Sequence, residues 1–180
     1  MFEVKKSLKS ICSQSIIIQK YIEKVFLFNR RKFDIRTYFL AVTINGILKF
    51  FWYDEGYLRT SSELYTLNDF DALVHLTNDA IQVEGEKYSE YEIGNKISYK
   101  EFQRYLNQNY NDKYSVEYLH GEMKKIAKIV IKSIYSKVNP PKCKYSFELF
   151  GLDFIIDHEF RPWLIEINTN PCLEVPAPNL

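Results

Sequence analysis

The stretch from Ser146 to Asn168 reads SFELFGLDFIIDHEFRPWLIEIN and decides the fold of this chain. Two arms rich in aromatic and branched side chains flank the short segment His158–Arg161, and Pro162 marks the return of the chain. Arms of this composition, joined by a loop of about four residues, predict an antiparallel β-hairpin.

The loop also predicts the register of the hairpin. If Asp157 pairs with Pro162, then Asp153 lies opposite Glu166. Successive side chains of a strand point to opposite faces, and directly paired residues share a face. One face of the hairpin is then expected to be wholly apolar, with Leu152, Phe154, Ile156, Trp163, Ile165 and Ile167.

The other face of the predicted hairpin is polar. It carries Asp153, Glu166 and Asn168, and Gly151 leaves space beside them, opposite Asn168. Two carboxylates directly opposite each other destabilise a hairpin unless something neutralises them. One interpretation is a carboxylate that is simply solvated on an open sheet face. Three converging oxygen ligands favour a Mg²⁺ site instead, because this cation prefers oxygen ligands and bridges to phosphates.

A second set of charged residues lies in the predicted strand Lys32–Ile44. Lys32, Asp34 and Arg36 alternate with apolar residues and therefore share one face of that strand. They form either an exposed face of mixed charge or a clamp for phosphate and carboxylate groups, in which Lys acts as a point charge and Arg as a bidentate fork. Arg59 follows a predicted turn and is a candidate to join them.

The remaining strand signals lie in the first third of the chain. Ser15–Gln19 is a short apolar segment. Asn45-Gly46 is a strong signal for a two-residue hairpin turn, so we expect the strand before it to pair with Ile47–Tyr53. Asp54–Gly56 predicts a further turn of the chain.

Two helices are expected after an irregular stretch that ends near Asn95. Ser98 with Glu101 resembles a capping box that opens a helix. The segment Gly121–Lys137 carries apolar residues at helical spacing, and Asn139-Pro140-Pro141 predicts its end. The whole pattern predicts an α+β fold with a mainly antiparallel sheet and flanking helices.

Composition sets the class of protein. A chain of 180 residues with 46% hydrophobic content is long enough for one globular domain. Its net charge of +1 gives no sign of nucleic-acid binding, and no apolar run reaches the length of a membrane span. The cysteines Cys12, Cys143 and Cys172 match no zinc or disulfide spacing, and the start lacks a signal-peptide pattern. We therefore expect a soluble cytoplasmic protein.

Five motifs, in order, resemble those of tubulin–tyrosine ligase and its relatives, which are ATP-grasp enzymes. The resemblance runs from about Ile16 to Pro171. Its motifs are Gln19–Ile22, the KFDIR strand Lys32–Arg36, Gly56–Ser62, His75–Asn78 and Phe147–Pro171.

The resemblance assigns roles to particular residues. Arg36 and Arg59 would act on the transferring group, and Asp153, Glu166 and Asn168 would hold Mg²⁺. The residues expected to bind ATP are Gln19, Lys20, Tyr21 and Ile22 at the adenine hinge, together with Lys32, Asp34, Thr77 and Asn78. We interpret His75 as a packing histidine.

The reaction that the resemblance implies is an ATP-dependent ligation. ATP would phosphorylate a protein carboxylate to an acyl phosphate, and the amino group of a free amino acid would displace phosphate to form an amide. The acceptor would be tubulin at its C-terminal tail, in tyrosination, glycylation or glutamylation, which also suggests association with microtubules or cilia.

The resemblance covers only part of what the family contains. The family has an N-terminal domain and a first ATP-grasp half before the hinge, with a glycine-containing loop over the phosphates. Here only a short segment precedes Gln19, and the six glycines do not cluster. We therefore expect residues 1–180 to form a single, partial ATP-grasp domain that lacks the N-terminal subdomain. The alternative function is a catalytically inactive fragment or a tubulin-binding module.

Overall fold

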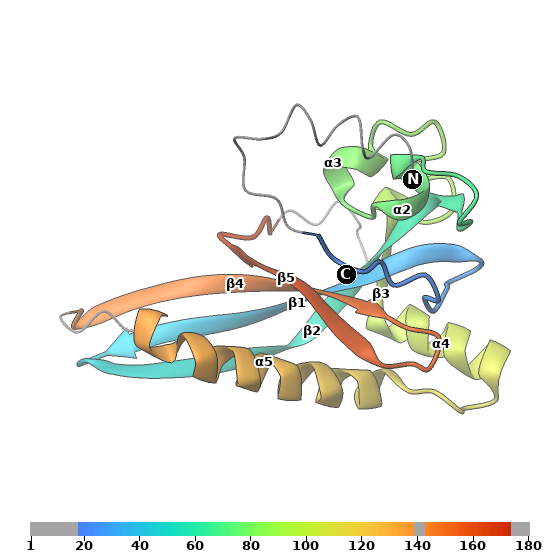
Figure 1. The fold of residues 1–180 in the computed structure, drawn as a ribbon. Helices are drawn as coiled ribbons and strands as arrows, with labels where there is room; N and C mark the ends of the chain where they lie inside the picture. Colours follow the sequence, from blue (N-terminus) through green and yellow to red (C-terminus); the bar gives the residue numbers. More distant parts are fainter. Residues whose placement is uncertain (1–17, 139–142, 174–180) are drawn as a thin grey trace.

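A computed structural model describes residues 18–138 and 143–173. Its five strands form one antiparallel sheet in the order β3-β2-β1-β4-β5 (Figure 1). The strands are β1 (Arg31–Ile44), β2 (Ile47–Leu64), β3 (Lys96–Ser98), β4 (Tyr145–Ile156) and β5 (Pro162–Thr169). The helices are α2 (Ala72–His75), α3 (Asp79–Gln82), the 3₁₀ turn η1 (Ile93–Asn95), α4 (Tyr99–Tyr110) and α5 (Val116–Val138).

The predicted α+β class with an antiparallel sheet and flanking helices is confirmed. In Figure 1, α4 and α5 lie on one side of the sheet and α2 and α3 lie on the other. The predicted strand Ser15–Gln19 falls largely outside the described residues, and Ile18 and Gln19 are not in a strand. Cys12 and the predicted helix stop at 139–141 also lie outside them. Among the described residues, no helix combines the length and the apolar character of a membrane span.

The hairpin between β1 and β2 closes where the sequence predicts it. Asn45 and Gly46 adopt positive φ angles of 51° and 78°, as a two-residue turn of the primed type requires. Ile44 pairs with Ile47 directly across this turn.

The second predicted turn, Asp54–Gly56, is wrong. β2 runs straight through these residues. The pairing shifts between Phe39 with Trp52 and Thr37 with Gly56, so the residues 53–55 face only Tyr38 on β1. The polar and glycine residues that suggested a turn are accommodated as a bulge, which bends and twists a strand without ending it.

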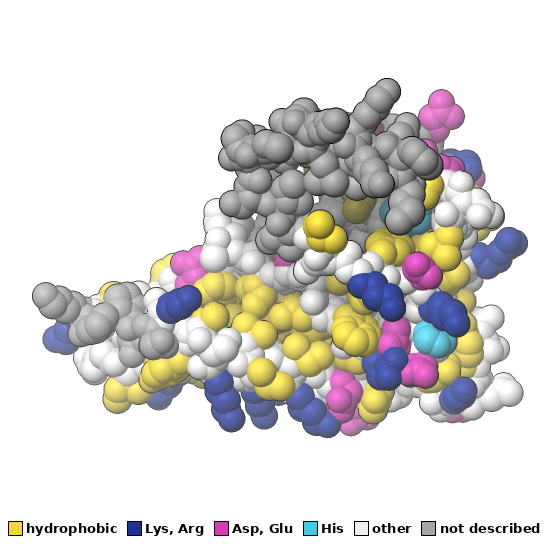
Figure 2. Space-filling view, in the orientation of Figure 1, with side chains coloured by type: hydrophobic (Ala, Val, Ile, Leu, Met, Phe, Trp, Pro, Cys, Tyr) yellow, Lys and Arg dark blue, Asp and Glu magenta, His cyan; other side chains and the backbone are white. Residues whose placement is uncertain are grey.

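The helices confirm most of the helix predictions. Ser98 and Glu101 make the reciprocal hydrogen bonds of a capping box at the start of α4. α5 begins at Val116, earlier than predicted, and buries Leu119, Met123 and Ala127 against the sheet. Figure 2 shows a row of basic side chains along the lower edge of the molecule, where α5 lies, in keeping with its lysine-rich outer face.

The core fills the space between the sheet and these two helices. Alternate residues of β1, among them Phe33, Ile35 and Phe39, point into it and are 1% exposed. They pack with Leu58 of β2, with Leu152, Phe154 and Ile156 of β4, and with Phe102 and Leu106 of α4. The intervening residues of β1 therefore point to the opposite face of the sheet, where the polar side chains gather.

The β4–β5 hairpin confirms part of its predicted register. Asp153 pairs with Glu166, and Gly151 pairs with Asn168, as expected. Nearer the loop the prediction is wrong, because Ile156, not Asp157, pairs with Pro162.

Two further features of the hairpin explain this difference. Asp157 instead binds the loop, since its carboxylate accepts hydrogen bonds from the backbone N–H groups of Glu159 and Arg161 and from the indole of Trp163. The pairing then shifts at Ile165, between Phe154 with Leu164 and Asp153 with Glu166. Trp163 and Ile165 are therefore 49% and 55% exposed, contrary to the predicted apolar face.

Candidate functional site

A band of charged side chains crosses the sheet on the face opposite the core. Neighbouring strands bring these residues into register by direct backbone pairing. One row runs Lys96, Arg59, Asp34, and the next runs Arg36, Asp153, Glu166. The predicted sharing of one face by Lys32, Asp34 and Arg36 agrees with this arrangement.

At the centre of the band lies the arginine–carboxylate cluster, formed by Asp34, Arg36, Arg59 and Asp153. Arg36 binds both carboxylate oxygens of Asp153, with Nη2 3.0 Å from Oδ2. Arg59 binds both oxygens of Asp34, with Nε 3.0 Å from Oδ1, and its Nη2 also lies 2.9 Å from Oδ2 of Asp153. Asp153 is therefore shared by both arginines.

The four side chains of the cluster are at most 10% exposed. Burial by itself raises the pKa of Asp153, but the guanidinium groups of Arg36 and Arg59 outweigh it and hold that pKa below its usual value. Burial lowers the pKa of Arg59, and the carboxylates of Asp34 and Asp153 reverse this and raise it. Buried charges persist only when they are paired, and here the two positive and two negative charges cancel.

Glu166 and Asn168 border the cluster from β5. The amide nitrogen of Asn168 lies 3.4 Å from Oδ2 of Asp153 and 3.2 Å from Oε1 of Glu166. The structure thus brings together the three residues predicted to hold a metal, and the arginines and this amide relieve the repulsion between the two carboxylates. Within the described residues there is no cluster of three or more His, Cys, Asp or Glu side chains that could bind a metal.

Gly151 gives Arg36 room to lie across β4. A Cβ atom at Gly151 would be 3.4 Å from Cδ of Arg36 and 2.9 Å from the side chain of Pro171. This agrees with the predicted role of Gly151 in leaving space beside the polar residues.

Lys32 lies at the other end of the same strand face, in a network of its own. Its Nζ donates to the hydroxyl of Tyr21 at 3.0 Å and to the carbonyl of His75 at 2.7 Å. The Nδ1 atom of His75 lies 2.8 Å from the same hydroxyl. Burial lowers the pKa of Lys32 to about 8, and the nearby charge of Asp34 opposes that shift. Two separate sequence motifs thus meet at one ammonium group.

The predicted adenine hinge lies beside the β4–β5 loop. Lys20, Tyr21 and Ile22 line a cavity of about 460 Å³ together with residues of that loop, including Asp157 and Trp163. Gln19 is exposed and does not line this cavity.

Thr77 and Asn78 stand apart from the arginine–carboxylate cluster. Thr77 is buried, and the carbonyl of Asn78 accepts backbone hydrogen bonds at the start of α3. The following residue, Asp79, reaches the Nζ of Lys96 at 2.6 Å, which places this segment at the β3 end of the polar band.

Sequence reasoning missed two residues of the band, Lys96 and Tyr57. Lys96 is 4% exposed and lies over the ring of Tyr57, with Nζ 5.7 Å from the ring centre. Tyr57 precedes Arg59 by two positions, so strand alternation alone could have placed it on the same face. Lys96 belongs to a three-residue strand whose short length gave no such signal.

The chain resembles known proteins over nearly its whole length. A sequence model described as the tubulin-tyrosine ligase family matches residues 2–180. Protein monoglycylase TTLL8 of Homo sapiens is 36% identical over 170 residues, which cover 90% of this chain and 19% of the relative. Tubulin glycylase 3A of Drosophila melanogaster is 39% identical over 168 residues, which cover 91% of this chain and 17% of the relative.

A third relative belongs to another branch by its name. Probable tubulin polyglutamylase TTLL9 of Rattus norvegicus is 34% identical over 161 residues, which cover 89% of this chain and 34% of the relative. The chain thus spans between 17% and 34% of the length of these three relatives. With a family match from residue 2 to residue 180, the chain belongs to the tubulin-tyrosine ligase family.

Proposed function

We propose that this chain forms part of an ATP-dependent ligase that joins a free amino acid to a carboxylate of tubulin. The observation that carries the proposal is the arginine–carboxylate cluster, which lies beside Glu166 and Asn168 on one face of the sheet. Relatives named as glycylases and polyglutamylases support glycine or glutamate as the amino acid.

The donor set beside the cluster fits Mg²⁺ in its chemistry. Asp153, Glu166 and Asn168 offer two carboxylates and an amide, and the amide of Asn168 lies within hydrogen-bonding distance of both carboxylates. They would hold the ion, which would supply charge neutralisation for ATP phosphates. Lys32 and the segment Gln19–Ile22 would bind ATP toward the opposite end of β1, and Thr77 and Asn78 would orient its phosphates.

The reaction would proceed in two displacements. An oxygen of the acceptor carboxylate attacks the γ-phosphorus of ATP, and ADP leaves, giving an acyl phosphate. The amine of the amino acid then attacks the acyl carbon, inorganic phosphate leaves, and the amine loses a proton. Arg36 and Arg59 would bind the oxygens that carry negative charge in both steps, because guanidinium groups match carboxylate and phosphate geometry.

We propose that the cluster opens for this chemistry. Both oxygens of Asp153 bind guanidinium groups in the structure, so a metal at Asp153 would compete with Arg36 and Arg59 for this carboxylate. If Asp153 turned toward the metal, Arg36 and Arg59 would each lose one carboxylate partner and would become available to an anionic substrate. Binding of the metal and binding of the anion would therefore favour each other.

The same closed arrangement favours one alternative, a tubulin-binding module without ligase chemistry. Incubation of the full-length protein that contains this chain with tubulin, Mg²⁺-ATP and radiolabelled glycine, glutamate or tyrosine separates the two functions. We expect incorporation of one label, abolished by Glu166→Gln. Cosedimentation with microtubules without incorporation of any label would support the binding module and reject the ligase.

A further inference from the structure

The polar face of the sheet changes character along its strands. Beyond Arg36, β1 continues with Tyr38 and Leu40 on the same face, and β4 contributes Leu149 two positions before Gly151. A cavity of about 780 Å³ opens over this part of the sheet. We call it the tyrosine groove, and its lining residues include Tyr38, Leu40, Tyr53, Tyr57, Tyr99 and Leu149.

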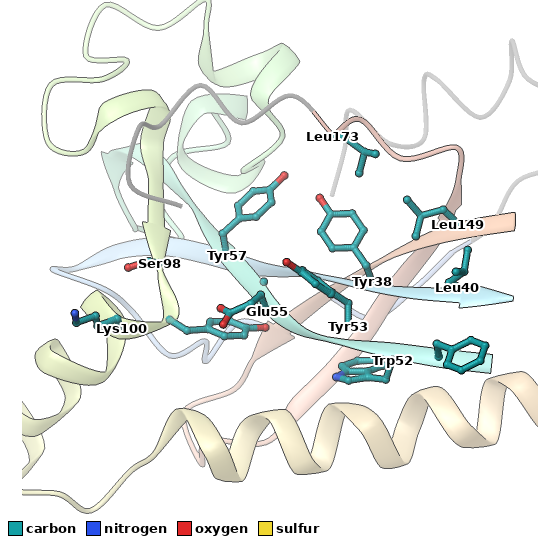
Figure 3. Close-up of a pocket in the computed structure, with 13 residues that line it drawn as sticks. Tyr38, Leu40, Trp52, Tyr53, Glu55, Tyr57, Ser98, Lys100, Leu149 and Leu173 are labelled. Carbon is teal, nitrogen blue, oxygen red and sulfur yellow. The ribbon is translucent and has the colours of Figure 1, made fainter.

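The side chains of the groove converge on one space. Figure 3 shows Tyr38, Tyr53 and Tyr57 pointing into the same opening from two strands. Leu149 and Leu173 border the opening on another side (Figure 3). The helix α5 and most of α4 pack on the other face of the sheet, and only the first two residues of α4, Tyr99 and Lys100, line the groove.

The groove is continuous with the arginine–carboxylate cluster. Tyr57 pairs with Arg36 across β1 and β2, and Tyr38 pairs with Gly151 across β1 and β4. Burial raises the pKa of Tyr57, the hydroxyl of Tyr38 adds to this shift, and the charges of Arg36 and Arg59 oppose it. Tyr57 pairs with Arg36, shares a strand face with Arg59 and lines the groove, so it forms the wall shared by the cluster and the groove.

The position of the groove indicates its occupant. On the Lys32 side of the cluster lie the residues proposed to bind ATP, held there by the contacts of Lys32 with Tyr21 and His75. A polypeptide whose carboxylate reaches Arg36 has to leave by another route. The groove extends from Arg36 in the opposite direction along the same strand.

The chemistry of the groove suits an extended polypeptide held by nonpolar contacts. The charged residues that line the groove are Glu55 and Lys100, and their opposite charges sum to zero. Tyrosine offers a rigid apolar ring for packing and a hydroxyl for the peptide backbone at little entropic cost. The hydroxyl of Tyr99 is buried and has no hydrogen-bond partner among the described residues.

We propose that the tyrosine groove binds the segment of acceptor polypeptide adjacent to the carboxylate that is modified. This inference rests on the proposed ligase function and adds a binding site to it. The cluster binds the reacting carboxylate by charge, and the groove binds the neighbouring peptide by aromatic contact.

The test uses a fluorescein-labelled peptide of the α-tubulin C-terminal tail, titrated with the chain in Mg²⁺ and a non-hydrolysable ATP analogue. Tyr53→Ser is the test variant, because Tyr53 lines the groove yet is 57% exposed, so its loss leaves the core intact. We expect about tenfold weaker peptide binding, the effect of losing one aromatic anchor, and unchanged nucleotide binding. The weakening should persist at high salt, since the lost contacts are nonpolar.

Phe147→Ser is the matched control. Phe147 is 76% exposed on the same face of β4, and it does not line the groove. Equal peptide affinity for the Tyr53→Ser and Phe147→Ser variants would reject the groove as the peptide-binding site. Nucleotide binding without any peptide binding would reject it as well. Neither result would contradict the ligase proposal. Peptide binding that depends on Tyr53, with no amino-acid incorporation, would reject only the ligase proposal.

Discussion

At the scale of single residues, Asp153 is the centre of the site because it binds both arginines of the cluster. Its two oxygens accept from Arg36, and Oδ2 also lies 2.9 Å from Arg59. A side chain shared in this way constrains the orientation of every group around it.

Replacement of Arg36 by Lys should be costly although the charge is kept. Lys offers a point charge and cannot bind both oxygens of Asp153 in the geometry of the guanidinium fork. We expect Arg36→Lys to lower the free energy of unfolding by about 1–3 kcal/mol and to abolish most ligation. Urea denaturation and label incorporation measure the two effects. Lys128→Ala, an exposed change on α5, is the control, and similar values for the two variants would exclude a clamping role for Arg36.

Lys32 should make stability depend on pH in the alkaline range. Its pKa is about 8 in the folded protein and 10.5 in the unfolded chain, so between these values the unfolded state binds more protons. The contribution of Lys32 to stability should therefore rise as the pH increases from 8 to 10.5. Denaturation of the parent and of Lys32→Met across this range isolates the effect. A difference between them that stays constant with pH would contradict the prediction.

At the scale of elements, the bulge in β2 depends on Gly56. A Cβ atom there would lie 2.5 Å from the hydroxyl of Tyr99 and 2.6 Å from the carbonyl oxygen of Arg36. Gly56→Ala should destabilise the protein by about 1–3 kcal/mol, because one of these contacts is with backbone that cannot move freely. Gly121→Ala on α5 meets no atom within 4 Å and should stabilise by about 0.5–1 kcal/mol. Thermal denaturation measures the stability of both variants. A Gly56→Ala variant as stable as the parent would contradict the need for glycine at the bulge.

The β4–β5 hairpin provides a second test at this scale. The bulge at Ile165 leaves that side chain 55% exposed, whereas Leu152 is fully buried. Leu152→Ala should cost about 2–5 kcal/mol through lost packing, and Ile165→Ala should cost less than about 1 kcal/mol. Chemical denaturation compares them directly. A comparable loss in both would mean that Ile165 belongs to the core after all.

The helices and strands also show which features local sequence patterns can predict. Alternation along Lys32–Arg36 and the Ser98–Glu101 capping box depend on neighbours in the chain, and the structure agrees with both. The bulges at Asp54–Gly56 and Ile165 depend on contacts between residues far apart in the sequence, such as the approach of Tyr99 on α4 to Gly56 on β2. Local residue patterns contain no information about those contacts, and the exposure of Trp163 was mispredicted for that reason.

The sequence also predicted only part of the candidate site. Strand alternation placed Asp153 opposite Glu166, and the structure has this pair. No pattern along the chain could indicate that Arg36 and Arg59 would share Asp153, because the three residues come from three strands. The position of Lys96 in the band likewise follows from the pairing of β3 with β2.

At the scale of the whole molecule, the two faces of the sheet differ in composition and in what they contact. One face packs on α4 and α5, and the other carries the polar band and the tyrosine groove. Substitutions of exposed residues on the second face should therefore change binding with little loss of packing. Because the ligand-binding face is separate from the core, binding of a ligand to it can be measured as a change in the stability of the whole molecule.

Glu166→Gln tests this separation. Glu166 is exposed and belongs to the polar face, so the variant should melt like the parent in metal-free buffer, within about 0.5 kcal/mol. Addition of Mg²⁺ and ATP should raise the melting temperature of the parent only, because ligands that bind the folded state stabilise it. A variant that melts well below the parent without metal would identify Glu166 as a structural hydrogen-bond partner and reject the metal assignment.

The cancelling charges of the arginine–carboxylate cluster also constrain how such a chain can evolve. A lineage that lost Asp34 alone would leave the guanidinium of Arg59 short of one of its two buried partners, and loss of Arg59 alone would strand Asp34. Each intermediate is less stable than a chain in which both have become neutral. Members of the family that abandon ligation should therefore replace positions 34 and 59 together, so that covariation of this pair would mark the loss of activity.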